Sequence, residues 1–159
     1  MRLLILAALP LIAAAECPPG GAPLPAGFAA WRAPIMLPAG RDPAGAPSLP
    51  PGKAARVTLL PVARLRFAAP PEHAPAAGSR GALIALEVTK PGGYTVALGT
   101  AAWIDLVRDG KPIASTGHQH GPACSGIRKL VRFDLTPGRY LIQLSGAKIS
   151  EVVLQVAPA

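Results

Sequence analysis

Aromatic side chains are scarce in this sequence, which has two Trp, two Tyr and three Phe among 159 residues. Proteins that bind single-stranded nucleic acids stack the bases on aromatic rings along a basic groove. The basic residues here are scattered along the chain rather than grouped. Although the formal net charge is +8, we therefore expect no nucleic-acid partner.

Acidic residues and catalytic motifs are also few. The eight Asp and Glu residues include no pair that suggests glycosidase chemistry. The sequence has no G-x-x-x-x-G-K phosphate loop, no H-E-x-x-H zinc motif and no nucleophile elbow around its serines. Nothing local requires an enzyme, so a non-catalytic role is favoured and the question of activity stays open.

Long hydrophobic runs are absent after residue 15, where no segment approaches the roughly 18 apolar residues of a membrane-spanning helix. Residues 1–15 combine one basic residue, an apolar run, and small residues at Ala13 and Ala15 before Glu16, the pattern of a secretory signal peptide. We expect cleavage near Ala15–Glu16 and a periplasmic or secreted chain that does not span the membrane. Its net charge would be near +7, because residues 1–15 hold one of the 16 basic residues and none of the eight acids. Glu16 argues against a lipoprotein, whose processing site needs a small residue there.

Only two cysteines are present, Cys17 and Cys124. An even count in an oxidising compartment predicts one disulfide bond. The bond would close a loop of about a hundred residues, to which the chain-entropy model assigns about 4–5 kcal/mol. It would tie the mature N-terminus to the loop that carries two histidines.

Proline is abundant and unevenly placed. Ten of the twenty prolines lie between Pro18 and Pro51, and because proline lacks an N–H donor, we expect no regular ladder or helix there. Residues 16–52 are therefore interpreted as a Pro/Gly/Ala-rich leader, and residues 53–159 as the folded domain. Trp31 lies in the leader and either plugs one end of the core, which is favoured, or stacks on a ligand.

From residue 53 onward, apolar and polar residues alternate with the period of half-buried strands. The alternation from Arg56 to Phe67 predicts one strand with Pro61 at an edge or bulge. The Asp109-Gly110 pair predicts a hairpin turn. About eight short strands and no helical stripe indicate an all-β fold, an antiparallel sandwich or jelly roll with Greek-key connections.

A short repeat supports a sandwich. PGGYTVAL and PGRYLIQL share the pattern P-G-x-Y-x-x-x-L, in which Pro-Gly favours a type II turn before a strand. The position of Tyr94 and Tyr140 is similar to that of the tyrosine corner, where the hydroxyl binds nearby backbone. Both tyrosines are predicted to be structural.

The most distinctive stretch is STGHQHGPACSGIRK, residues 115–129. In a strand, His118 and His120 would point to one side, and imidazoles are ligands for Zn, Cu or Fe. Two ligands do not make a site, and the third would have to be His73 or an acid brought near by the fold. The alternatives are a pinned surface loop with solvated or backbone-bonded histidines, which is favoured, a metal site, and acid–base catalysis.

The run from Gly81 to Leu144, above all AWIDLV, HQHGPACSGIRK and LTPGRY, resembles a group of small exported bacterial proteins that carry the label homogentisate 1,2-dioxygenase. The label implies a cupin-like, iron-dependent oxidoreductase in which two histidines and a glutamate hold the metal. His118 and His120 match the His-x-His of the first cupin motif, and its glutamate position falls on Cys124 or Ser125. No histidine follows His120 to match the second motif. The C-terminal half is also similar in pattern to pre-peptidase and carbohydrate-binding sandwiches, a similarity that concerns fold alone.

The favoured hypothesis is an exported periplasmic β-sandwich that acts as a non-catalytic binding or accessory module. Its candidate ligand surface comprises Trp103, Asp105 and Arg128, although Asp105 is also compatible with an ordinary solvent-side position on a strand. The ligand is a small molecule or a component of the cell envelope. The first alternative is a mononuclear metal protein, a dioxygenase by its label, that holds one Fe, Cu or Zn ion with His118, His120 and His73. The second is an envelope structural protein whose basic face binds polysaccharide.

Overall fold

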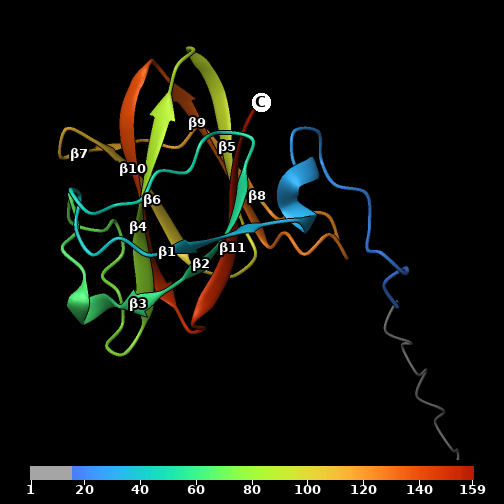
Figure 1. Cartoon of the computed structure of the whole chain (residues 1–159), viewed down its shortest axis with the longest axis horizontal. Coiled ribbons are helices and arrows are strands. Elements are labelled where there is room, and N and C mark those ends of the chain that lie inside the picture. The colour runs from blue at the N-terminus through green and yellow to red at the C-terminus, as the bar shows by residue number, and fades with distance from the viewer. Residues whose placement is uncertain (1–15) are drawn as a thin grey trace, which may run out of the picture.

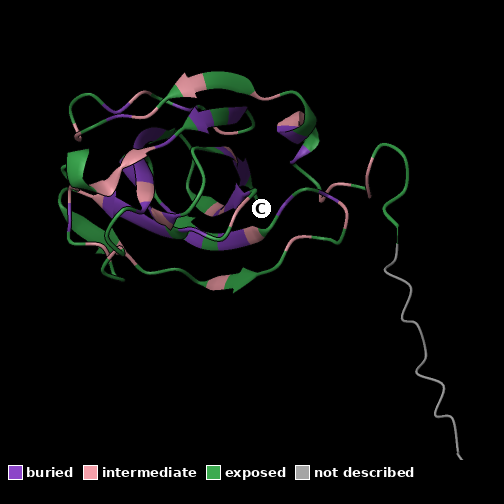
Figure 2. Cartoon of the chain, turned by 90° about the horizontal axis from the view of Figure 1, so that it is seen from below, coloured by how far each residue is buried: buried purple, intermediate pink, exposed green. Residues whose placement is uncertain are grey.

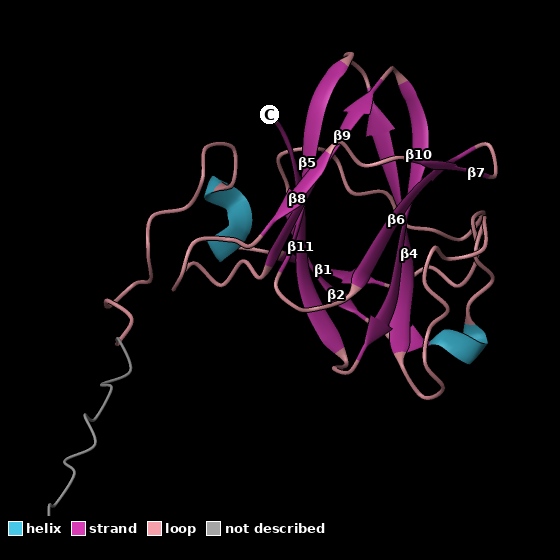
Figure 3. Cartoon of the chain, turned by 180° about the vertical axis from the view of Figure 1, so that it is seen from behind, coloured by secondary structure: helices cyan, strands magenta, loops and turns pink. Residues whose placement is uncertain are grey.

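The computed structural model describes residues 16–159, so the predicted signal peptide, residues 1–15, lies outside the described residues. Two sheets face each other, and Figures 1 and 3 show them as two layers. The first sheet, called sheet A, has the order β1 (Ile35–Pro38), β2 (Ala54–Thr58), β11 (Glu151–Pro158), β5 (Gly92–Leu98), β9 (Lys129–Leu135), β8 (Gly117–Gln119). The second, sheet B, has the order β3 (Leu60–Pro61), β4 (Arg80–Val88), β10 (Gly138–Ala147), β6 (Trp103–Arg108), β7 (Lys111–Ile113).

All strand pairs are antiparallel except β1 with β2. The prediction of an all-β sandwich is confirmed, whereas the predicted Greek-key connectivity stays a prediction. In the described chain, no helix is long and apolar enough to cross a membrane. The predicted Cys17–Cys124 disulfide is confirmed, with Cα atoms 5.4 Å apart.

The main core lies between the sheets and follows from the pleat. Alternate residues of each strand point inward, as Ile104 and Leu106 of β6 and Val131 and Phe133 of β9 do. Figure 2 shows buried segments in the middle of the molecule and exposed loops around it. The inner strand β4 of sheet B is buried along nearly its whole length, which a sheet with one solvated face would not allow. The outer face of sheet B must therefore be covered, and the buried Ala97 and Leu130 show the same for sheet A.

The leader covers one of these faces. A 3-10 helix, η1 (Ala29–Arg32), presents Trp31, which packs with Phe28 against Ala97 and Leu130 on the outer face of sheet A. The leader also supplies β1 and the fully buried Leu49. The expectation that no ladder forms in this segment is wrong at β1, which pairs with β2 at the edge of sheet A and has its one proline, Pro38, as its last residue.

A second segment, residues 65–73, crosses the outer face of sheet B and is called the strap here. Leu65 and Phe67 pack against a cluster on that face that includes Leu83 and Leu141. Figure 3 shows η1 and the second 3-10 helix, η2 (Val62–Arg64), on opposite outer sides of the two sheets. The single strand predicted from Arg56 to Phe67 is wrong. The chain leaves sheet A after Thr58, joins sheet B at β3 and turns through η2 into the strap.

Tyr94 and Tyr140 each lie near the start of a strand, directly after equivalent Pro-Gly turns. Tyr94 donates a hydrogen bond to the Lys90 carbonyl at 2.9 Å, and Tyr140 donates one to the Thr136 carbonyl at 2.9 Å. Both side chains are buried, and this geometry is what a tyrosine corner requires. The hydroxyl of Tyr140 also accepts a hydrogen bond from the Arg108 guanidinium at 3.1 Å. Burial opposes ionisation of Tyr140, but the hydrogen bonds from Thr136 and Arg108 outweigh it and lower the pKa of the phenol.

Candidate functional site

The candidate site begins at Trp103, the first residue of β6. Ile104 and Leu106 face the core, so Trp103 and Asp105 fall on the outer side of sheet B. The indole is 43% exposed, which makes Trp103 one of the few large apolar side chains at the surface. Asp105 is only 9% exposed, so it is not the solvent-side strand residue that the sequence left open.

The strap places a histidine on this indole. The buried Gln143 of β10, which pairs with Asp105, bonds the Ala69 N–H and carbonyl through its side chain and also accepts a hydrogen bond from the Ala68 N–H. The Glu72 N–H points to the Asp105 carboxylate at 3.4 Å. The next residue, His73, stacks on Trp103 with ring centroids 3.5 Å apart and planes 5° apart. The polar groups of β10 and β6 thus fix the position of His73.

Lys129 reaches the same indole from sheet A. It opens β9 opposite Leu98, whose side chain lies in the core, so Lys129 points toward the gap between the sheets. Its ammonium donates a hydrogen bond to the Ala102 carbonyl at 3.1 Å and lies 4.6 Å from the centroid of a Trp103 ring. This distance is within the range of a cation–π interaction. Trp103 is therefore held from both sheets.

Two ionisable groups in this cluster have shifted pKa values. Burial raises the pKa of Asp105, and the Glu72 N–H and the nearby Lys129 charge offset only part of that effect. Burial also lowers the pKa of Lys129, and the negative charges of Asp105 and Glu72 offset part of that. The Asp105 Oδ2 atom is buried without a hydrogen-bond partner in the described chain. Burial therefore disfavours the charged form of both groups.

A pocket of about 460 Å³ opens beside Trp103. Its walls are Ala101, Ala102 and Trp103 from the start of β6, His118, Gln119 and His120 from β8 and its extension, and Arg128 and Lys129 from the start of β9. We call it the basic pocket, because its walls hold two cationic side chains and two imidazoles but no carboxylate. Gln119 and apolar surface from the indole and the alanines form the rest.

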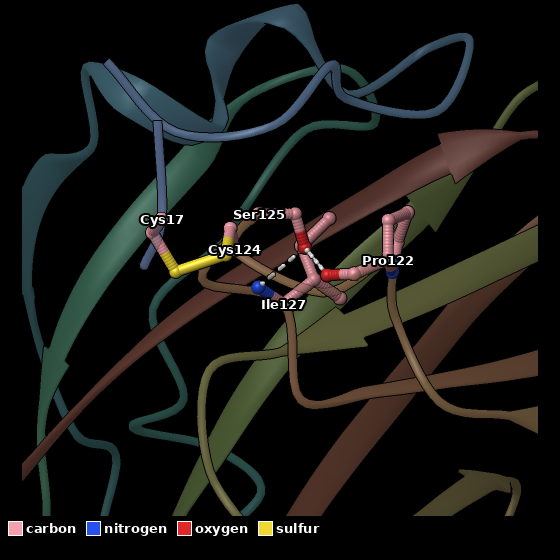
Figure 4. The surroundings of a disulfide bond; sticks show 5 residues. All are labelled: Cys17, Pro122, Cys124, Ser125 and Ile127. Carbon is pink, nitrogen blue, oxygen red and sulfur yellow. Dashed lines mark hydrogen bonds between the residues drawn. A yellow bond between two sulfur atoms is a disulfide. The ribbon is translucent and has the colours of Figure 1, made fainter. Parts of the chain in front are cut away.

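Two local features place the histidines there. His118 of β8 pairs with Val131, a core-facing residue, so the imidazole faces the gap between the sheets. His120 lies two residues further along, and its Nδ1 is 3.3 Å from the Arg128 carbonyl oxygen. The chain then turns back through a loop whose Cys124 is bonded to Cys17. Figure 4 shows this disulfide beside the short return of the chain to β9.

The loop also bears on the iron site that the resemblance implies. The cupin glutamate position falls on Cys124, which is in the disulfide, or on Ser125. The Ser125 hydroxyl donates a hydrogen bond to the Pro122 carbonyl and accepts one from the Ile127 N–H (Figure 4). Among residues 16–159, no three His, Cys, Asp or Glu side chains converge as metal ligands. The ligand set of an iron dioxygenase is therefore not assembled there.

Most of the predicted site residues are nevertheless neighbours. Trp103, His118, His120 and Arg128 line one pocket, and His73 and Asp105 support its tryptophan. His73 stacks on the indole, and among residues 16–159 it forms no group of metal ligands with His118 and His120. Sequence reasoning missed Lys129 and Gln143. The alternation of β9 gave the one available signal, because it puts Lys129 in phase with the core residues Val131 and Phe133.

Neither the protein-family models nor the curated proteins contain a match to this chain. Function must therefore be argued from the site itself.

Proposed function

We propose that the protein is an exported, periplasmic binding or accessory module whose basic pocket holds a ligand with a carboxylate next to an apolar group. The observation that carries this proposal is the composition of the pocket: Arg128, Lys129 and two imidazoles beside an indole, with no acidic wall. The predicted signal peptide and the disulfide support export, since disulfides persist in oxidising compartments.

The state of Lys129 explains why an anion would bind. Its ammonium lies in partly buried surroundings that lower its pKa, and the negative charges of Asp105 and Glu72 offset only part of this effect. A bound carboxylate adds the negative charge that stabilises the ammonium further. Hydrogen bonds between ionised partners are about twice as strong as neutral ones. The fixed indole adds apolar contact for the rest of the ligand, and sites that combine apolar walls with a few polar groups are typical of small-molecule binding.

Direct binding to the disulfide-bonded chain, residues 16–159, tests the proposal. The probes are glucuronic acid oligosaccharides, phenylacetate and an N-acetylated dipeptide. Each is compared with its uncharged amide, and the affinity is measured by calorimetry. We expect the acids to bind better than the amides and to bind more weakly as salt rises. Binding should persist in EDTA, because the pocket uses an ammonium and imidazoles without a metal.

A matched pair of variants assigns the site. Lys129→Met keeps the apolar stem and removes the charge, whereas Lys148→Met removes an exposed charge outside the pocket. We expect Lys129→Met to weaken the binding of the carboxylates at least several-fold. Lys148→Met should leave their affinity unchanged. Equal binding of acids and amides, no binding at millimolar concentration, or equal losses in both variants would refute the proposal.

A further inference from the structure

The strand that carries Trp103 is paired only in part along one of its edges. On one side, β10 pairs with β6 from Trp103 to Val107. On the other side, β7 pairs only with Leu106, Val107 and Arg108. In the described chain, the stretch Trp103–Asp105 therefore has a neighbouring strand on one side only. An open strand edge offers unpaired backbone groups to a further strand.

The hairpin determines which backbone groups face that open edge. The turn residues Asp109 and Gly110 both have positive φ, 51° and 72°, as a two-residue type I′ hairpin requires. Arg108 and Lys111, which flank this turn, form a hydrogen-bonded pair, and so does the pair two residues further, Leu106 with Ile113. Pro112, which has no N–H, falls in the non-bonded pair between them, as this register demands.

The same alternation places the N–H and C=O of Ile104 on the open edge, together with the C=O of Ala102. The Ala102 carbonyl lies beyond the β10–β6 ladder, which ends at Trp103, and it accepts a hydrogen bond from the Lys129 ammonium at 3.1 Å. No loop or side-chain hydrogen bond among residues 16–159 uses either backbone group of Ile104. Ile104 thus offers one donor and one acceptor in strand geometry.

There is space beside these groups. A second pocket of about 370 Å³ lies at Ile104 and Leu106, between Glu72 of the strap and the Ile113–Ser115 stretch that leaves β7 for sheet A. The basic pocket lies at the other end of the same edge, beyond Trp103. The open edge of β6 therefore runs from one pocket to the other.

Direction and charge together select an occupant. A strand that continues the line of β7 runs antiparallel to β6, from the pocket at Leu106 toward Trp103, so its C-terminal end arrives at Lys129 and Arg128. A parallel strand would bring its N-terminal ammonium to the same cations and be repelled. We propose that the free C-terminus of an extended peptide adds to the open edge of β6, with its carboxylate in the basic pocket. Main-chain pairing of this kind is a recurring mode of peptide recognition.

This inference rests on the proposed function, since it names the source of the carboxylate. It assigns the peptide's last two or three residues to the edge. One peptide amide pairs with Ile104, and the terminal carboxylate meets Lys129.

The test uses a library of random hexapeptides with free C-termini and the same library amidated at the C-terminus, both incubated with disulfide-bonded residues 16–159. We expect enrichment of free-acid peptides alone. For an enriched peptide, N-methylation of the amide that pairs with Ile104 should weaken binding several-fold, in line with loss of one hydrogen bond. The Ile104 amide should become protected from hydrogen exchange when the peptide binds. Lys129→Met should reduce free-acid binding to the level of the amide, and Lys148→Met should not.

The outcomes separate the two proposals. If small carboxylates bind in a Lys129-dependent manner but free-acid peptides are not enriched, or if N-methylation and Ile104 exchange show no effect, the peptide inference is overturned and the proposed function stands. Equal enrichment of acid and amide peptides also overturns it. If neither peptides nor small carboxylates bind, both proposals fail.

Discussion

The two outer faces of the sandwich are both covered, but by different means. On sheet A the cover is mainly apolar, with Phe28 and Trp31 of the leader packed on the strands. The Cys17–Cys124 bond and the amide nitrogen of Gln155 also join the leader to the fold. On sheet B the strap is held more fully by polar groups, because Gln143 uses both ends of its amide on it. Apolar contacts are non-directional, whereas hydrogen bonds fix position. The strap that stacks His73 on Trp103 lies on the side where hydrogen bonds fix position.

Each cover also contacts a fully buried glutamine on a strand of its sheet. Gln155 of β11 donates hydrogen bonds from its amide nitrogen to the Gly27 and Gly52 carbonyls, while its Oε1 has no partner in the described chain. Gln143 of β10 uses both ends of its amide on the strap. Gln155 therefore uses only half of its amide group on the leader. Gln143 uses all of its amide group to hold the strap, which places His73 on Trp103.

The largest effect should come from removing the apolar cover of sheet A. We expect Trp31→Ala to lower the free energy of unfolding by about 3–5 kcal/mol, because a buried indole is lost and a cavity remains. Trp103→Ala, at an indole that is 43% exposed, should cost only about 1 kcal/mol. Urea unfolding of both variants measures the difference. Similar losses would mean that burial of Trp31 on sheet A contributes no more than the half-exposed Trp103 does.

Reduction of the disulfide should have the next largest effect. The bond spans 107 residues of sequence, and removal of such a bond from a small domain costs about 2–5 kcal/mol. We expect a Cys17→Ser, Cys124→Ser double variant to lose stability in this range. Dithiothreitol should shift the wild type to the same midpoint and leave the variant unchanged. A wild type that is insensitive to reductant would show that packing of Trp31 alone holds the leader.

The two glutamines provide the sharpest comparison. We expect Gln143→Ala to lower the free energy of unfolding by about 2–3 kcal/mol, because it leaves buried N–H and C=O groups of the strap without hydrogen-bond partners. Gln155→Ala should cost about 1 kcal/mol, since it also removes an unpaired buried oxygen. Trp103 fluorescence, measured in a Trp31→Phe background, should change only with Gln143→Ala, because only that change frees His73. If the order of the two costs is reversed, the strap is not held by its hydrogen bonds.

The same contrast shows what the sequence could predict. Alternation and the tyrosine repeat predicted the sheets, and cysteine arithmetic predicted the bond. Burial of Trp31 could be predicted from its large apolar side chain, but the paths of the two covers could not. The leader is rich in Pro, Gly and Ala and has no periodicity, and the alternation at Leu65 and Phe67 indicates a strand where the chain instead crosses sheet B. Gln143 and Gln155 occupy outward positions, which pattern analysis assigns to solvent. Their burial becomes apparent only once the leader and the strap are in place.

The site was predictable in its residue types and less so in its chemistry. His118, His120, Trp103 and Arg128 were expected near one another and share a pocket. Lys129 was not expected in the site, because strand alternation assigns it to the core face. At the end of a strand, however, a long cationic side chain can extend from the core face to the surface. His73 was expected as a ligand and is found stacked on an indole. Spacing predicts which side chains are neighbours along one strand, but contacts between strands depend on the whole fold.

The smallest effect concerns Asp105, beneath the strap. Burial raises the pKa of this carboxyl, so the folded chain binds its proton more tightly than the unfolded chain. The stabilising contribution of the neutral acid is complete below the unfolded pKa of about 3.8. It is lost as pH rises through the folded pKa. At neutral pH, burial of the charged Asp105 carboxylate beneath the strap therefore lowers the free energy of unfolding.

Asp105→Asn removes that cost and keeps an oxygen for the Glu72 N–H. We expect the variant to be more stable than the wild type at pH 7 by less than about 1 kcal/mol, and equal to it below pH 3.8. The gain is small because Lys129 loses a nearby negative charge at the same time. Asp134→Asn, at an exposed position of β9, is the matched control and should follow the wild type at both pH values. A variant less stable at pH 7 would mean that attraction to Lys129 outweighs burial, and that Asp105 holds the ammonium in the pocket as Gln143 holds the strap.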